Sequence, residues 1–313
     1  MNLARLLDPR RYARARRIFR RPLGAHTTLA FATRASRTRT GPLALDFRRG
    51  GRLVFPRREE VWAALSHLLE DDVDPESVET DGRFLRLTWR GRPFEFEAAG
   101  MDLAVFWEIF RRDAYRLSEL PGHLGAVVDV GGNVGLFTSA VAGRAERVLF
   151  VEPVPANRER AAALFARQGI ADRVEIVPLA AGARTGDTVE LHLSAVSVCH
   201  STSRAYARGR YGGDGTVRVR TVAMADLLER LPGGRCDLMK IDAEGAEYDF
   251  LLAASPDALR RVRRLAVEVH VAPPDLPLER FGELRARLES AGFTVEHEPP
   301  GPPAFMLFAG RAD

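Results

Sequence analysis

The sequence has very little cysteine and almost no lysine. Its 313 residues include two cysteines, Cys199 and Cys236, which are too few for a disulfide framework or a four-cysteine zinc site. We therefore expect two free thiols in a reducing compartment. Lys240 is the only lysine among the 46 basic residues. A high genomic GC content alone favours arginine over lysine, so this bias by itself indicates no function.

Long uncharged apolar segments are also absent. No stretch reaches the roughly 18 apolar residues that a membrane-spanning helix requires. Arginines interrupt the beginning of the chain, so no secretory signal is predicted and a cytoplasmic location is expected. Residues 3–19 fit an amphipathic basic helix, which makes peripheral contact between residues 1–22 and an anionic membrane a hypothesis.

The basic residues are concentrated near the N-terminus. The net charge is +4, yet residues 1–60 contain 16 arginines and four acidic residues, so the remainder is net acidic. Such a segment indicates either an anionic partner or simply a solvated terminus. A nucleic acid is the weakest candidate partner, because aromatic residues are sparse there and no nucleic-acid-binding motif is present.

Residues 1–120 are predicted to form a basic segment followed by a small α+β unit. The length of the chain favours more than one domain. The aromatic residues Phe106, Trp107 and Phe110 are expected in the core of this unit. Its expected elements are a hairpin over 43–47 and 52–55, a helix over 59–70, a second hairpin over 84–89 and 93–98, and a helix over 102–118.

From residue 126 onward, strands and helices alternate, which predicts a parallel sheet covered on both faces. This second domain is expected to span 121–313. A polar connection as long as 195–215 is uncommon unless it is functional or disordered. Helices are expected over 134–142, 155–168, 223–230 and 277–291, with another beginning near Gly245. The expected strands are 126–131, 147–153, 174–180, 188–193, 217–222, 236–242 and 265–271, with a terminal hairpin over 293–298 and 304–310.

A glycine-rich turn follows the first strand of the second domain. It reads Asp129-Val-Gly131-Gly132-Asn133-Val-Gly135, and glycines at such a turn let the backbone approach a ligand. Glu152 ends the next strand, where a carboxylate can accept hydrogen bonds from two ribose hydroxyls. Val130 stands where the nicotinamide-dinucleotide fingerprint needs glycine. The pattern therefore favours an S-adenosylmethionine site over a dinucleotide site.

A second cluster, Lys240-Ile-Asp242-Ala-Glu244-Gly245-Ala-Glu247, lies at the end of a predicted buried strand. Strand alternation places Lys240 and Asp242 on one side, and Glu244 and Glu247 are neighbours if the next helix has begun. A lysine in an apolar strand needs a paired charge or access to water. Lys240 therefore either belongs to an active site or only neutralises nearby carboxylates.

A third cluster lies at the end of the following strand, where Glu268 and His270 share one side. If the two strands are adjacent, His270 and Asp242 face the same crevice. A histidine beside a carboxylate suits general acid–base chemistry, and a purely structural histidine is the alternative. His200, with Ser201 and Ser203, lies in the long polar connection, which can cover such a site.

These segments together resemble the FkbM family of S-adenosylmethionine-dependent methyltransferases. The resemblance is carried by VVDVGGNVGLFT, by VEP with Asn157 four residues later, by LMKIDAEGAEYDFL and by VEVH, and it covers about residues 124–273. It implies an α/β fold of the class I methyltransferase-like (Rossmann-like) type, with a mostly parallel seven-stranded sheet, helices on both faces and an N-terminal α+β extension. The family usually has Gly-Ala-Asn where this chain has Gly131-Gly132-Asn133.

The resemblance implies methyl transfer from S-adenosylmethionine, most simply to a hydroxyl of a natural product, sugar or glycan. Asp242 or His270 is the expected general base, with Lys240 and Glu244 setting the electric field around it. Asp129 and Asn133 are expected to hold the ammonium and carboxylate of the cofactor. The full set of expected cofactor-binding residues is Asp129, Gly131, Gly132, Asn133, Gly135, Glu152, Pro153 and Ala180.

Several alternatives stay open. A carboxylate cluster can hold Mg²⁺, but this is not favoured and no metal ligand is assigned. Methylation of nitrogen on a small molecule, and a binding module without catalysis, are the competing functions. A nucleic-acid methyltransferase is disfavoured, because no Asn/Asp-Pro-Pro-aromatic signature follows the Asp242 strand. We therefore expect a small-molecule or glycan acceptor, and the sequence leaves the oligomeric state open.

Overall fold

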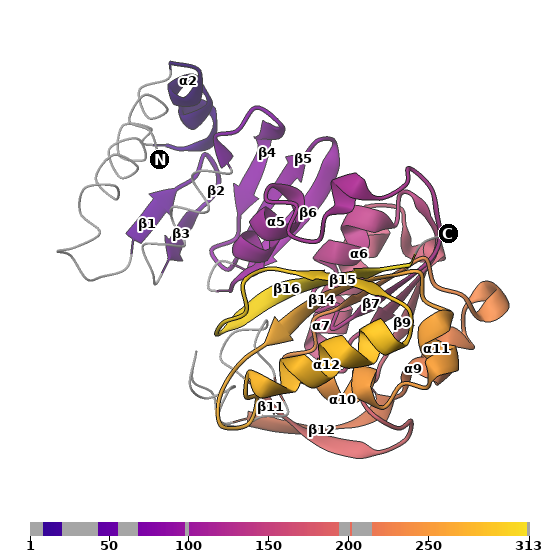
Figure 1. Cartoon of the computed structure of the whole chain (residues 1–313). Coiled ribbons are helices and arrows are strands. Elements are labelled where there is room, and N and C mark those ends of the chain that lie inside the picture. The colour runs from indigo at the N-terminus through magenta and orange to yellow at the C-terminus, as the bar shows by residue number, and fades with distance from the viewer. Residues whose placement is uncertain are drawn as a thin grey trace. The chain divides into compact units, whose positions relative to one another are not determined.

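The computed structural model describes residues 9–20, 43–55, 68–97, 100–193, 201 and 215–311. The chain forms two compact units, Met1–Arg111 and Arg112–Asp313 (Figure 1). The sequence pattern placed this division later, between residues 120 and 121. Most of the predicted helix 59–70, most of the 195–215 connection and parts of the 1–22 segment lie outside the described residues.

The first unit contains a four-stranded sheet in the order β2-β4-β5-β6 and a separate β1-β3 hairpin. Both predicted hairpins are confirmed, since β1 pairs with β3 and β5 pairs with β6, each antiparallel. The sequence does not predict β4, because this segment contains Pro75 and proline is rare within strands. A register shift between Asp74 and Glu79 accommodates the proline. The elements are α2 (Pro9–Ile18), β1 (Leu43–Asp46), β2 (Arg49–Gly50), β3 (Arg52–Phe55), β4 (Val73–Thr80), β5 (Phe84–Trp89), β6 (Arg92–Glu97) and α5 (Asp102–Phe110).

The last predicted helix of this region is shorter than its apolar pattern suggests. The pattern predicts a helix over 102–118, but α5 ends at Phe110, and Asp113 has a φ of 53°, outside the helical region. The Asp113 carboxylate instead accepts two backbone N–H groups, at 2.6 and 3.1 Å, and starts a new turn. Phe106 is buried as predicted, whereas Trp107 is 40% exposed and does not belong to the core.

The second unit contains a seven-stranded sheet in the order β15-β16-β14-β13-β7-β8-β9. The strands from β14 to β9 are parallel, and β16 runs antiparallel to both of its neighbours. This order confirms the predicted class I methyltransferase-like fold. The strands are β7 (Leu124–Val130), β8 (Ala145–Val151), β9 (Val174–Val177), β13 (Leu238–Ile241), β14 (Arg264–His270), β15 (Thr294–His297) and β16 (Ala304–Gly310).

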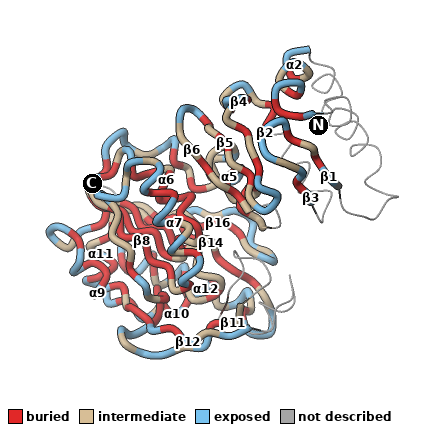
Figure 2. The backbone as a smooth tube through the Cα atoms, turned by 180° about the vertical axis from the view of Figure 1, so that it is seen from behind, coloured by how far each residue is buried: buried red, intermediate tan, exposed pale blue. Residues whose placement is uncertain are grey.

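Helices cover both faces of this sheet, as predicted. Successive side chains of β8 point to opposite faces of the sheet. On one face, Phe150 packs against Ala161 and Phe165 of α7. On the other face, Leu149 and Val151 belong to the hydrophobic core that contains residues of α9 to α12. The central strands β7, β8 and β13 are accordingly almost entirely buried (Figure 2). Within the described residues, no helix is long and apolar enough to cross a membrane. The helices are α6 (Leu136–Val141), α7 (Pro155–Arg167), α9 (Met224–Leu228), α10 (Glu247–Leu252), α11 (Pro256–Arg260) and α12 (Glu279–Ser290).

One predicted strand is divided between two sheets. The pattern over 174–180 predicts a single strand, but β9 ends at Val177, and β10 (Ala180–Ala181) pairs with β12 (Gly215–Val222). Pro178 lies between them and has no N–H with which to continue the ladder. β11 (Thr188–Leu193) pairs with β12 in antiparallel orientation, as predicted for a peripheral strand.

Candidate active site

The predicted cofactor-binding turn connects β7 with α6 and requires two of its glycines. Gly131 has a φ of 69°, and a Cβ there would lie 1.8 Å from the backbone oxygen of Asp242. Gly135 has a φ of 86°, and a Cβ there would lie 2.6 Å from the ring of Phe165. Side chains other than glycine are strained in this conformation and have no room here. The turn therefore passes close against the end of β13.

The departure from the Gly-Ala-Asn pattern of the family has a steric explanation. A Cβ on Gly132 would lie 2.2 Å from Cε2 of Phe150, and Phe150 is fully buried against α7. An alanine at this position therefore fits only if the aromatic ring moves. In this chain the Phe150 ring, from the neighbouring strand β8, occupies the space that the alanine methyl group would fill.

Glu152 follows β8 directly and is only 5% exposed. Its Oε2 accepts the backbone N–H of Asn133 at 2.9 Å, and its Oε1 accepts the N–H of Val154 at 2.8 Å and the Asn157 amide at 3.4 Å. The carboxylate thus joins the glycine turn to the start of α7. Burial raises the pKa of Glu152 to about 7, although these hydrogen bonds act in the opposite direction.

The glycine turn also presents a polar atom without a partner. Asn133 Oδ1 is shielded from solvent and accepts no hydrogen bond from any residue in the described part of the chain. Such an acceptor is unfavourable in the free protein, and an ammonium group of a ligand would satisfy it. Pro153 follows β8 and Ala180 follows β9, so these predicted contacts lie at the same edge of the sheet. Together with Glu152, these groups fit a nucleoside that carries an amino acid, such as S-adenosylmethionine.

Asp129 and Lys240 form a buried ion pair beneath the glycine turn. Lys240 Nζ lies 3.1 Å from Asp129 Oδ1 and donates hydrogen bonds to the backbone oxygens of Gly131, at 2.7 Å, and Val130, at 3.3 Å. The Thr138 hydroxyl donates to the other Asp129 oxygen at 2.7 Å. Asp129 has no exposed surface. Asp129 therefore stabilises the turn from its buried side. The expected direct contact between Asp129 and the ammonium of the cofactor is excluded by this burial.

Lys240 also contacts the exposed part of the site. Its Nζ lies 3.6 Å from Asp242 Oδ2 and 6.0 and 5.9 Å from the ring centroids of Tyr115 and Phe137. Burial lowers the pKa of Lys240, but Asp129 and Asp242 raise it more, so the net pKa is above its ordinary value. Lys240 is therefore a buried cation between the ends of β7 and β13. Its compact ammonium bonds to backbone and carboxylate oxygens in different directions, which a planar guanidinium does not reproduce.

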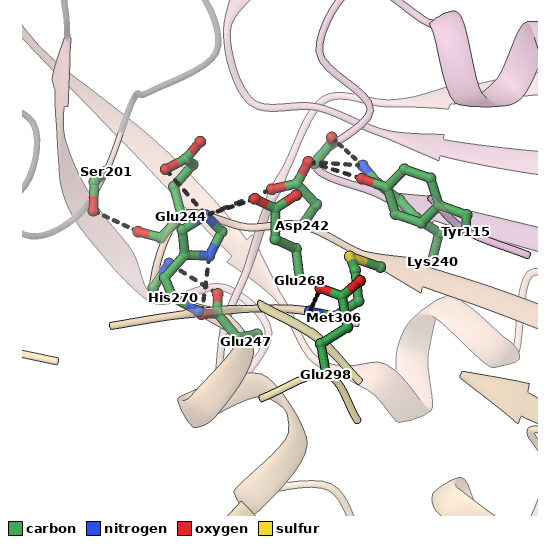
Figure 3. A network of polar contacts seen from close by, with 12 residues as sticks. Tyr115, Ser201, Lys240, Asp242, Glu244, Glu247, Glu268, His270, Glu298 and Met306 are labelled. Carbon is green, nitrogen blue, oxygen red and sulfur yellow. Dashed lines mark hydrogen bonds and ion pairs between the residues drawn. The ribbon is translucent and has the colours of Figure 1, made fainter. Parts of the chain in front are cut away.

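His270 ends β14 and is held in place by Glu247 (Figure 3). Glu247 is fully buried, and its Oε1 accepts the backbone N–H of His270 at 2.9 Å and lies 3.2 Å from Nδ1. Because a carboxylate only accepts, Nδ1 is the donor and Nε2 points to the crevice. The helical spacing considered for Glu244 and Glu247 does not apply, since α10 begins at Glu247 and Glu244 lies before it with a φ of 51°.

Three carboxylates surround the other nitrogen of the imidazole. His270 Nε2 lies 3.4 Å from Glu244, 3.8 Å from Glu268 and 3.9 Å from Asp242 (Figure 3). β13 and β14 are adjacent, so Asp242 and His270 meet as the strand pattern predicts. Burial lowers the pKa of His270, but Glu244 and Glu247 raise it more, and the net pKa is well above its ordinary value. The surrounding carboxylates therefore favour the protonated imidazole, in which neither nitrogen has a free lone pair to act as a base.

Asp242 lies between the two buried cations and remains accessible. Its side chain is 26% exposed, and the Tyr115 hydroxyl donates to its Oδ2 at 3.4 Å. Sequence reasoning missed Tyr115, which lies in an irregular segment 127 residues before Asp242. It also left Glu247 out of the site, although the Lys240 motif contains this residue, because spacing alone does not show its burial. Ser201 was named only as part of a covering loop, and its Oγ donates to the backbone oxygen of Glu244 at 2.5 Å.

One group of side chains is close enough to be considered for a metal. Asp242, Glu268 and His270 each bring one ligand atom within 4.8 Å of the others. A cation there requires the lone pair of His270 Nε2, and in the charged imidazole that nitrogen carries a proton. The proton therefore competes with a metal for this position, and we assign no metal ligand.

Comparison with known proteins identifies the family. A profile described as the methyltransferase FkbM domain matches residues 129–295. Methyltransferase sdnD of Sordaria araneosa is 26% identical over 235 residues, which cover 66% of this chain and 88% of that protein. The AMB antimetabolite synthetase AmbE of Pseudomonas aeruginosa is 31% identical over 240 residues, which cover 65% of this chain but only 11% of the synthetase.

Among solved structures, methyltransferase FkbM from Methylobacillus flagellatus KT is similar with a TM-score of 0.42 and 14% identity, over 80% of this chain and 54% of that one. The profile match is the stronger finding, because it extends over more than half of the chain and includes the glycine turn, Lys240, Asp242 and His270. The chain therefore belongs to the FkbM methyltransferase family.

Proposed function

We propose that this protein is an S-adenosylmethionine-dependent O-methyltransferase. The observation that carries the proposal is that two complementary sites share one sheet edge: the glycine turn with Glu152 and Asn133 Oδ1, and the charged crevice around Asp242. Lys240 connects them, because its Nζ lies 2.7 Å from the Gly131 oxygen and 3.6 Å from Asp242. A cofactor on the turn and an acceptor in the crevice would therefore meet beside Asp242.

When bound, S-adenosylmethionine supplies a methyl group on a sulfonium, which needs no further activation. The residues of this chain then mainly provide position. Glu152 accepts hydrogen bonds from the ribose hydroxyls, Asn133 Oδ1 accepts one from the amino-acid portion, and Gly131 and Gly135 let the turn approach both. Orientation of two reactants is worth roughly 7–11 kcal/mol, so we expect it to be the largest contribution to the rate.

Asp242 is the proposed general base. Tyr115 and Lys240 hold its Oδ2, at 3.4 and 3.6 Å, which leaves Oδ1 to accept the proton of the acceptor hydroxyl. In the displacement that the cofactor would supply, the bond between the acceptor oxygen and the methyl carbon would form as the methyl–sulfur bond breaks and the neutral thioether leaves. Asp242 would take the hydroxyl proton. A base in this position typically contributes about 10²–10⁴-fold to the rate. His270, already charged, supports the carboxylates around it and does not take the proton.

The proposed acceptor is a hydroxyl on a natural product, sugar or glycan. Support comes from AmbE, which is named as an antimetabolite synthetase and is similar to this chain over 240 residues. The charge of the crevice counts against an anionic acceptor, because carboxylates there outnumber cations. The carboxylates are Asp129, Asp242, Glu244, Glu247 and Glu268, and the cations are Lys240 and His270.

Incubation of the full chain with isotopically labelled S-adenosylmethionine and a panel of hydroxylated natural products, sugars and glycans tests this function. We expect a labelled methyl ether by mass spectrometry with the wild type and a strongly reduced yield with Asp242→Asn. If amine acceptors yield labelled methylamines and no acceptor yields an ether, the protein is an N-methyltransferase and the proposed O-methylation is wrong. Tight cofactor binding without product from any acceptor would favour a non-catalytic binding module.

A further inference from the structure

A second cavity lies in the C-terminal unit, at the opposite end of β14 from the crevice. It has a volume of about 360 Å³ and is lined by the first residues of β14, by residues of β15 and β16, and by the segment that contains Tyr115 and Leu120. Arg264 begins β14 and His270 ends it, so at the usual strand rise the two sites are roughly 20 Å apart. The volume falls within the range of roughly 300–1,000 Å³ found for small-molecule sites.

Arg264 is the unusual residue of this cavity. Its side chain makes no ion pair or hydrogen bond with any residue that the structure describes, and its Nη1 is shielded from solvent. A partly buried guanidinium without a counter-ion is unfavourable. The other two arginines at the cavity wall differ. Arg116 pairs with Glu296 at 2.7 Å and stacks over the Phe308 ring at 4.0 Å. Arg311 donates to the backbone oxygen of Ala291 and stacks over the Phe293 ring at 4.3 Å. The positive charge of Arg264 is therefore left unbalanced.

The acidic residues at the cavity wall do not remove this imbalance. Glu119 and Glu296 both line the cavity, but each lies against Arg116, at 4.0 and 2.7 Å. The remaining wall includes a further arginine, Arg311, together with apolar and aromatic residues such as Phe308 and Ala266. The cavity thus combines the fork-shaped cation of Arg264, which has no acidic partner among the described residues, with some surface suited to the apolar body of a small molecule.

We propose that this cavity binds a small organic molecule through a carboxylate or phosphate group. Arg264 offers two parallel N–H donors, the geometry that these oxyanions accept. The apolar part of the ligand would contact Phe308 and Ala266. The site is centred on Arg264, at the other end of β14 from His270, although Tyr115 lines the cavity and also bonds Asp242. Its test needs neither the cofactor nor a methyl acceptor, so its failure leaves the proposed methyl transfer unaffected.

Calorimetric titration of the full chain with phenyl phosphate and with benzoate tests the proposal, and benzyl alcohol is the uncharged comparison. We expect the wild type to bind one or both anions at least about tenfold more tightly than the alcohol. Arg264→Gln should weaken that binding by about tenfold or more, and Arg264→Lys, which keeps the charge without the fork, by less. Arg285→Gln is the matched control, because Arg285 is an exposed arginine paired with Glu289 on α12, and it should bind as the wild type does.

Circular dichroism and thermal unfolding establish whether each variant is folded. If Arg264→Gln does not fold, the affinity of Arg264→Lys for the two anions tests the proposal instead. Binding of phenyl phosphate alone identifies a phosphate ester as the ligand class, and binding of benzoate alone identifies a carboxylate. The proposal is overturned if the wild type binds neither anion at about 10 mM, or if benzyl alcohol binds equally well. It is also overturned if folded Arg264 variants bind like the wild type.

Discussion

Glu247 Oε1 contacts both the backbone N–H and the Nδ1 of His270, at 2.9 and 3.2 Å. The same carboxylate accepts the backbone N–H of Gly245 at 2.8 Å through its Oε2, so it connects the loop after β13 with the end of β14. A buried charge that loses its partner is strongly unfavourable. Glu247 therefore holds the imidazole in its orientation. The imidazole in turn stabilises the positions of the carboxylates that surround Nε2.

Glu247→Gln is expected to keep the shape of this contact and remove its charge. We expect the free energy of unfolding to fall by about 1–3 kcal/mol, because His270 Nδ1 loses a charged acceptor. The pKa of His270 should move down, since Glu247 is one of the groups that raise it. Urea unfolding and NMR titration of the histidine measure these effects. The control is Asp249→Asn on the same helix, where Asp249 is exposed and pairs with Arg280 at 2.8 Å; it should change stability by no more than about 0.5 kcal/mol.

Lys240→Arg tests whether the site needs a compact ammonium. The Lys240 side chain is only 4% exposed and lies 3.1 Å from Asp129, so a larger, planar cation must displace the glycine turn. We expect a loss of about 1–3 kcal/mol in stability and weaker binding of S-adenosylmethionine. Thermal unfolding and calorimetry measure the two quantities, with Arg285→Lys as an exposed control. Wild-type stability and affinity in Lys240→Arg would show that lysine has no special role here.

Gly132→Ala is expected to be destabilising because of Phe150. The new Cβ would lie 2.2 Å from the ring, and overpacking of this kind costs about 1–3 kcal/mol. Phe150→Leu should itself destabilise the wild type but recover part of the loss in the Gly132→Ala background, because the smaller side chain makes room. A double-mutant cycle by urea unfolding measures this coupling. Purely additive effects would refute the steric explanation for the departure from Gly-Ala-Asn.

Much of the crevice was predictable from strand alternation. Lys240 with Asp242, and Glu268 with His270, each share a side by the period of two, and parallel strands bring their carboxyl ends to one edge. The sequence also predicted the glycine turn and Glu152 beside it, because these depend on local backbone requirements. The mostly parallel, seven-stranded character of the large sheet, with helices on both faces, followed from the family resemblance.

Other features depend on contacts between distant residues and were not predictable. Tyr115 reaches Asp242 across 127 residues, and no periodic pattern marks it. The left-handed backbone of Glu244 places its carboxylate before α10, where helical spacing does not apply. The burial of Asp129, which excludes it from direct ligand contact, results from Lys240 and Thr138 engaging both of its oxygens.

Glu152 makes the affinity for S-adenosylmethionine depend on pH. Burial raises its pKa to about 7, so the carboxyl group of the free protein is partly protonated near neutrality. Ribose hydroxyls favour the ionised form, so binding lowers this pKa and releases protons. Affinity should therefore rise from about pH 5.5 to pH 7 and level off above about pH 8. Calorimetry in buffers of different ionisation enthalpy measures the proton release.

Glu152→Gln is the control for this pH dependence. The amide does not titrate and accepts hydrogen bonds more weakly than a carboxylate. We expect this variant to bind S-adenosylmethionine more weakly and to lose the rise in affinity below pH 8. A wild-type affinity that is constant across this pH range, or an equal rise in Glu152→Gln, would show that Glu152 is not the group that meets the ribose.

Calorimetric titration of the full chain with S-adenosylmethionine tests the proposed function most directly. We expect one site per chain with a Kd of about 1–100 µM, weakened at least about tenfold by Glu152→Ala. Asp242→Asn should bind the cofactor nearly as the wild type does, while its turnover falls by about 10²–10⁴-fold. No detectable binding of S-adenosylmethionine to the folded wild-type chain at about 1 mM would contradict the assignment of the glycine turn and Glu152 to the cofactor.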